Sequence, residues 1–219
     1  MKILVINPNS SIEMSESIKE TVRAAAGDRF EAEVCRITEA PPFIGSYADQ
    51  LASGPHLLKL LKEQEDNYDG FIIACHLDPC LDAAKEITGK PVMGIGEVSM
   101  RMAPLLGRKF SVVGSSSATT YLKRRMVEQY GLGKFLASVR APKPEWTGSQ
   151  EELLIRAAGQ AVREDGADVI VLGCAGFTGL DEAIKDAVKV PVLDGVACAL
   201  AVMEGVLNMR GCTCRKNSK

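Results

Sequence analysis

The sequence predicts an α/β protein with two pseudo-symmetric lobes, each a parallel sheet flanked by helices, and a functional site in the cleft between them. Three observations predict this architecture: an internal repeat, strands that are apolar along their whole length, and a regular alternation of strands with helices. The chain has 219 residues, of which 46% are hydrophobic and 25% are charged. This length and this balance allow a substantial buried core.

The repeat is clearest in two segments, 69–98 (DGFIIACHLDPCLDAAKEITGKPVMGIGEV) and 168–197 (DVIVLGCAGFTGLDEAIKDAVKVPVLDGVA). Each contains an acidic residue, an apolar strand, a cysteine, a polar loop, an amphipathic helix and a second short strand after Pro-Val. The two cysteines, Cys75 and Cys174, lie 174 − 75 = 99 residues apart. A duplicated unit of this kind predicts two lobes that face each other across a pseudo-twofold cleft.

The strands and helices of the two halves follow one rhythm. Continuous apolar runs, such as ILVI at 3–6 and VIVL at 169–172, are typical of parallel strands that are buried on both faces. Between them, helical patterns predict helices at 11–26, 57–65, 81–88, 118–130, 150–165, 181–188 and 195–208. The predicted lobes are residues 1–98 together with 195–219, and residues 99–194.

Composition excludes several classes of partner. A net charge of −2 and a pI near 5.8 do not favour nucleic acid or a membrane surface. No apolar run approaches the roughly 20 residues that cross a bilayer, and the first run is too short for a signal peptide, so a cytoplasmic protein is expected. The seven cysteines are then expected to be free thiols. Neither the two histidines nor the lone Cys212-Thr-Cys214 motif indicates a metal site.

Cys75 and Cys174 are the candidate catalytic residues. Each follows a predicted buried strand and precedes a helix, which is where parallel α/β sheets bind ligands. A racemase that acts at a carbon acid needs a base on one face of the carbon and an acid on the other. Two cysteines can supply both if their pKa is lowered toward neutrality. A single cysteine in this position is more often a buried apolar residue, but a pair at matched positions of a repeat favours catalysis.

Four short motifs carry a resemblance to a known family: Asn7-Pro8-Asn9-Ser10-Ser11, Ala74-Cys75-x-x-Asp78-Pro79, Gly94-Ile95-Gly96-Glu97 and Leu172-Gly173-Cys174-Ala175-Gly176. Together they resemble the aspartate/glutamate/hydantoin racemase superfamily, and most closely its hydantoin and allantoin racemases. Amino-acid racemases of the superfamily usually have Asn and Thr next to their cysteines, where this chain has His76 and Ala175. Related arylmalonate decarboxylases keep one cysteine, so the presence of both implies racemisation.

The resemblance implies a racemase of a 5-substituted hydantoin or of allantoin that uses no cofactor and assembles as a homo-oligomer. It implies that Cys75 and Cys174 are the acid–base pair and that the following residues contact the small-molecule substrate: Asn9, Ser10, His76, Ser116, Ser117, Ala175 and Gly176. The candidates for the pocket wall are Phe43, Tyr47 and Phe177. Two alternatives stay open: a racemase of aspartate or glutamate, and a non-catalytic ureide-binding protein with the same fold.

Overall fold

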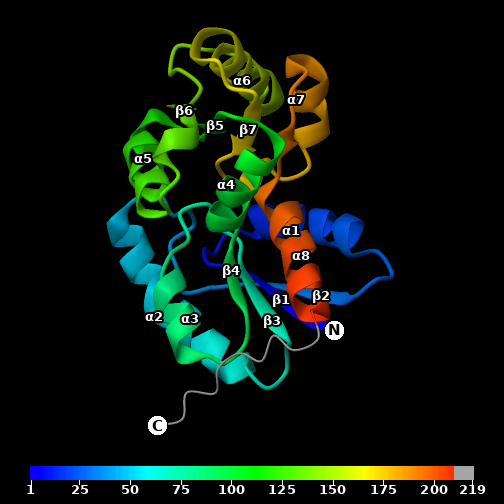
Figure 1. Cartoon of the computed structure of the whole chain (residues 1–219). Helices are drawn as coiled ribbons and strands as arrows, with labels where there is room; N and C mark the ends of the chain where they lie inside the picture. The colour runs from blue at the N-terminus through cyan, green and yellow to red at the C-terminus, as the bar shows by residue number, and fades with distance from the viewer. Residues whose placement is uncertain (210–219) are drawn as a thin grey trace.

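Two four-stranded parallel sheets form the framework of the protein (Figure 1). The computed structural model describes residues 1–209, so Cys212 and Cys214 lie outside the described residues. The first sheet has the strand order β2-β1-β3-β4, and the second has the order β6-β5-β7-β8. The strands are β1 (Lys2–Asn7), β2 (Glu31–Arg36), β3 (Gly70–Ile73), β4 (Val92–Gly94), β5 (Phe110–Val113), β6 (Leu136–Arg140), β7 (Val169–Leu172) and β8 (Val192–Leu193). The equivalent orders of the two sheets confirm the predicted fold class and the repeat.

The inner strands β1, β3, β5 and β7 are buried along almost their whole length, as their apolar sequences predict. The edge strands β2 and β6 are different. Glu31, Glu33 and Arg36 of β2 are exposed, and its sequence, EAEVCR, lacks a continuous apolar run. Sequence patterns that select buried strands therefore identify the centre of each sheet but do not identify β2 and β6.

The helices are α1 (Ile12–Ala26), α2 (Tyr47–Gln64), α3 (Leu81–Ile87), α4 (Ile95–Leu106), α5 (Thr120–Gln129), α6 (Gln150–Asp165), α7 (Asp181–Val188) and α8 (Gly195–Asn208). Local capping explains why several predicted starts are correct. The Ser11 hydroxyl accepts a hydrogen bond from the Met14 N–H at the start of α1. At the start of α6, Ser149 and Glu152 form a capping box.

The predicted start of the second helix is wrong. Helix α2 begins at Tyr47, with Ser46 as its N-cap, rather than at residue 57. The Gly54-Pro55 pair is normally a helix breaker, but here it lies inside α2. Gly54 is buried, and a Cβ atom there would lie 2.6 Å from the Cys80 sulfur. The glycine is therefore explained by close packing of α2 against the loop that follows β3.

Helix α4 is absent from the sequence-based expectations, and it crosses the predicted lobe boundary at residue 98. It packs against α8 and also contacts one strand of each sheet, β4 and β7 (Figure 1). The largest hydrophobic cluster likewise contains residues of both sheets, such as Val5 and Val171. A continuous core therefore joins the two halves. No helix within residues 1–209 is long and apolar enough to cross a membrane.

The α4–α8 contact yields a stability prediction. A Cβ atom on Gly195 would lie 3.1 Å from both the Cβ and the carbonyl oxygen of Ile95, whereas one on Gly205, in the same helix, would meet no atom within 4 Å. We expect Gly195→Ala to lower the free energy of unfolding by about 1–3 kcal/mol because the helices must move apart. Gly205→Ala should be neutral or stabilising by up to about 1 kcal/mol. Urea denaturation of both variants checks this, and equal stability of the two would contradict it.

Candidate active site

A cavity between the two halves contains both candidate cysteines. It has about 360 Å³ of empty space, part of it open to solvent. Cys75 lines it from the loop after β3, and Cys174 lines it from the loop after β7. Asn9 and Ser115 reach it from the loops after β1 and β5. The carboxyl ends of the four inner strands therefore converge on one site, as expected for parallel α/β sheets.

The two cysteine loops share a local arrangement. The backbone N–H of Gly176 donates a hydrogen bond to the Cys174 sulfur, with an N···S distance of 3.4 Å. Leu77 and Gly176 each lie two residues after a cysteine, and their N–H groups favour the thiolate form of Cys75 and Cys174 respectively. Each half of the repeat thus supplies one thiol and one backbone donor.

Burial acts against the thiolate that the two-cysteine hypothesis requires. Burial raises the pKa of Cys75 to about 12, and it also raises the pKa of Cys174. The backbone donors after each cysteine and the nearby ammonium of Lys123 act in the opposite direction and favour the thiolates. Burial disfavours the charged form of any thiol, so the site needs a stabilising charge to generate a thiolate.

Only some of the residues predicted to contact the substrate line the cavity. Asn9, His76 and Ala175 line the cavity. Gly176 lies next to it, since its N–H bonds Cys174. Ser10, Ser116 and Ser117 do not line the cavity, and Ser116 and Ser117 are exposed. Ser115 and Thr119 line the cavity instead: Ser115 lies in the loop after β5, and Thr119 ends the short 3-10 helix (Ser117–Thr119) that follows this loop.

Of the three residues predicted to form the pocket wall, only one lines the cavity. Phe43 lines the cavity together with Ile44. Tyr47 is exposed at the start of α2, and Phe177 is buried in the core of the second sheet. An aromatic residue near a cysteine in sequence therefore does not by itself identify the wall.

His76 is a buried residue whose imidazole has no partner in the described part of the chain. Its side chain is 2% exposed, and neither ring nitrogen forms a hydrogen bond within residues 1–209. Burial, together with the charge of Lys123, holds the pKa of His76 well below its usual value. A neutral imidazole that lines a cavity can donate one hydrogen bond to a ligand and accept another.

Lys123 is the functional candidate that the sequence analysis misses. It lies in α5, is 2% exposed and lines the cavity, and its Nζ donates a hydrogen bond to the carbonyl of Gly173. The sequence did contain a signal. Lys123 shares the buried face of α5 with Leu122, Met126 and Val127, and a lysine on such a face is rarely buried without a reason.

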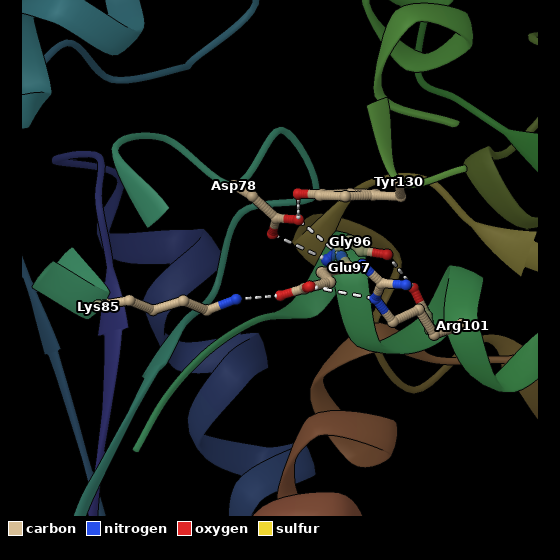
Figure 2. A network of polar contacts seen from close by, with 7 residues as sticks. Asp78, Lys85, Gly96, Glu97, Arg101 and Tyr130 are labelled. Carbon is tan, nitrogen blue, oxygen red and sulfur yellow. Dashed lines mark hydrogen bonds and ion pairs between the residues drawn. The ribbon is translucent and has the colours of Figure 1, made fainter. Parts of the chain in front are cut away.

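Buried carboxylates tie both cysteine loops to helix N-termini. Figure 2 shows the first of these contacts. The Asp78 carboxylate accepts hydrogen bonds from the N–H groups of Gly96 (3.0 Å) and Glu97 (2.6 Å) and from the Tyr130 hydroxyl (2.7 Å). Asp78 thereby caps α4 from the loop that carries Cys75. A side chain on Gly94 would overlap the Asp78 carboxylate, so the glycine makes this contact possible.

The second half achieves the same connection with a carboxylate from another position. Asp194, 100 residues after Gly94, caps α8 by accepting from the N–H groups of Val196 (2.7 Å) and Ala197 (3.2 Å). Its other oxygen accepts from the Gly179 N–H (3.0 Å) and the Thr178 hydroxyl, both in the loop after Cys174. The two halves therefore differ in which element carries the carboxylate, yet each fixes its cysteine loop.

The Asp78 network yields a pH-dependent prediction. Burial raises the pKa of Asp78 to about 7, although the bonds from Tyr130, Gly96 and Glu97 favour the carboxylate. Because this value lies above the unfolded value of about 3.9, the stability that the carboxyl contributes is full below pH 4 and is lost as the pH rises toward 7. We expect Asp78→Asn to be less stable than the wild type by about 1–2 kcal/mol at pH 4, and by less at pH 7.

Urea denaturation between pH 4 and pH 8 measures this difference. The control is Asp82→Asn, which removes an exposed carboxylate only four positions along the chain. Its effect should stay within about 0.5 kcal/mol at each pH. A wild-type advantage over Asp78→Asn that grows as the pH rises would contradict the raised pKa.

Comparison with known proteins agrees with the fold and shows the family. The chain matches the Asp/Glu/Hydantoin racemase family over residues 3–203. It is 34% identical over 226 aligned residues to a hydantoin racemase of Paenarthrobacter aurescens, an alignment that covers 100% of this chain and 96% of that protein.

Solved structures give the same result. An allantoin racemase from Klebsiella pneumoniae aligns with a TM-score of 0.92 at 31% identity, covering 100% of this chain and 91% of that structure. An allantoin racemase from Pseudomonas fluorescens aligns with a TM-score of 0.91 at 28% identity, covering 100% and 95%. With a matching family model, full-length relatives and two thiols in one cavity, the chain belongs to the Asp/Glu/hydantoin racemase family.

Proposed function

We propose that this protein racemises a 5-substituted hydantoin, allantoin included, with Cys75 and Cys174 as a two-base pair and without a cofactor. The observation that carries the proposal is the shared cavity: two thiols from matched positions of the repeat line one pocket. The similarity to hydantoin and allantoin racemases supports the substrate class. The active site would then be built from one copy of the repeat on each face of the substrate.

The proposed reaction moves one proton on and one proton off the ring carbon at position 5. The thiolate of one cysteine removes the proton from one face, and the electron pair of the C–H bond delocalises into the neighbouring ring carbonyl as an enolate. The thiol of the other cysteine then donates its proton to the opposite face. The first sulfur ends as a thiol and the second as a thiolate. Because each half supplies the same groups, the reaction runs in both directions.

The polar lining of the cavity suits a cyclic ureide. A hydantoin ring presents carbonyl oxygens and N–H groups, so it needs both donors and acceptors around it. The neutral imidazole of His76 offers one of each, and Asn9, Ser115 and Thr119 add further polar groups. Donors placed near the developing enolate oxygen stabilise the transition state more than the ground state.

The apolar part of the cavity suits the ring substituent. Met14, Phe43, Ile44 and Leu77 line it without contributing a charge. The residues beside the cysteines, His76 and Ala175, differ from the Asn and Thr that the resemblance associates with free amino acids. Both features favour a hydantoin over aspartate or glutamate.

Substitution of each cysteine tests the two-base mechanism. We expect Cys75→Ser and Cys174→Ser each to lower the racemisation rate by about 10²–10⁴, because each removes one proton-transfer group. The measurement is deuterium uptake from heavy water together with loss of optical rotation, for both enantiomers of a hydantoin and of allantoin. Cys35→Ser, which alters a thiol of edge strand β2, is the matched control and should keep full activity.

The possible outcomes separate the candidate functions. Full turnover in either single variant would exclude a mechanism that needs both thiols. Exchange with aspartate or glutamate but not with a hydantoin would indicate an amino-acid racemase. Tight binding of a ureide with no cysteine-dependent deuterium uptake would indicate a binding protein.

A further inference from the structure

Lys123 places a buried cation beside both cysteines. Its Nζ donates a hydrogen bond to the carbonyl of Gly173, the residue that precedes Cys174, and its side chain lines the cavity that also contains Cys75. An ammonium group has three N–H donors, and this is the one hydrogen bond that it forms within residues 1–209. It makes no ion pair with a carboxylate in that part of the chain either. A buried charge without a partner is costly, so the surroundings must compensate it.

The fold makes room for this lysine. A Cβ atom on Gly114, at the end of β5, would lie 2.9 Å from the Lys123 Cε, and one on Gly173 would lie 3.1 Å from the same atom. The side chain thus passes between the glycines that end two neighbouring inner strands. In the first half, the end of β1 carries Asn7, whose amide bonds Ser15 of α1 instead. The lysine is therefore a feature of the second half and is not a product of the repeat.

Four titratable groups face Lys123. They are the thiols of Cys75 and Cys174, the carboxyl of Asp78 and the imidazole of His76. His76 is neutral, for the reasons given above. The Asp78 oxygens are already engaged by α4 and by Tyr130. Burial lowers the pKa of Lys123, and both thiols, which line the same cavity, oppose this. Asp78 does not line that cavity. The thiols are therefore the acidic groups best placed to balance the ammonium.

We propose that Lys123 is the charge-balancing residue of the pocket, which holds the cysteine pair as one thiolate and one thiol. The proton that leaves one sulfur is held by the Lys123 amine, so the pair of groups carries no net charge. A single cation that faces both sulfurs stabilises one negative charge and leaves a second thiolate uncompensated. Lys123 itself transfers no proton to the substrate. It acts by stabilising the negative charge on the cysteine sulfurs.

This inference rests on the proposed racemase function, which explains why the protein would need one thiolate and one thiol. A two-base racemase needs one thiolate and one thiol at rest, because two thiols contain no base and two thiolates contain no acid. The negative charge moves from one sulfur to the enolate and then to the other sulfur. A cation beside both cysteines stays close to that charge throughout the reaction.

Thiol alkylation tests the proposal without any substrate. Cys75 and Cys174 are partly exposed, so iodoacetamide can report their thiolate content as a function of pH, with the two sites separated by mass spectrometry of peptides. We expect Lys123→Met to slow alkylation of the pocket thiols at pH 7 at least about tenfold and to move the pH midpoint upward. Lys123→Arg should retain a larger part of the wild-type rate, because it keeps the charge.

The matched control is Lys109→Met. Lys109 also donates its ammonium hydrogen to a backbone carbonyl, that of Lys134 at 2.7 Å, but it does not line the cavity. This variant should keep the wild-type alkylation profile. If Lys123→Met also keeps the wild-type profile, the proposal is wrong. The pH profile of kcat/KM should move upward with the alkylation midpoint in Lys123→Met alone.

A measurement on unsubstituted Lys123 covers the case in which its variants do not fold. The difference in ultraviolet thiolate absorption between wild type and the Cys75→Ser/Cys174→Ser double variant should correspond to one thiolate at neutral pH. A difference of zero or of two thiolates would overturn the proposal. Failure of deuterium exchange alongside the expected alkylation shift would remove the racemase function but leave the ion pair, so the two proposals fail separately.

Discussion

The anchoring of two loops against two helix N-termini is the constraint on which the site depends. Asp78 caps α4 from the loop that carries Cys75, and Asp194 caps α8 while it holds the loop after Cys174. Buried backbone N–H groups at a helix start need acceptors, and the side-chain oxygens of Asp78 and Asp194 supply them. The same hydrogen bonds therefore cap the helices and hold the loops that carry the two thiols.

Duplication explains the general plan of the protein but not its chemistry. The two sheets have equivalent strand orders, and both cysteines stand at matched strand ends. The two halves of the repeat differ in the positions of their charged residues around the cysteines. Gly94 occupies the position that corresponds to Asp194, and Lys123 has no counterpart beside β1. A symmetric pair of thiols is thus combined with an asymmetric arrangement of Asp78, Asp194 and Lys123 around it.

Burial strengthens hydrogen bonds in the pocket, but it also makes a thiolate there costly to form. A hydrogen bond in a medium of low dielectric is stronger than in water, but burial also raises the pKa of Cys75 and Cys174 and lowers that of His76. The N–H groups after each cysteine reduce this cost only in part. A cation that is itself buried interacts with a thiolate through a medium of low dielectric, where one charge has a large effect.

The sequence by itself determined the repeat, the buried inner strands, most helix starts and the cysteine pair, because these depend on residue types at short spacings. The resemblance to racemases also pointed to Asn9, His76 and Ala175, which line the cavity. The tertiary structure decided the rest. Helix α4 and the early start of α2 depend on packing around glycines. The choice of Ser115 over Ser116 and Ser117, the raised thiol pKa values and the place of Lys123 depend on burial by residues distant in the chain. No local pattern contains that information, because burial is a property of the assembled fold.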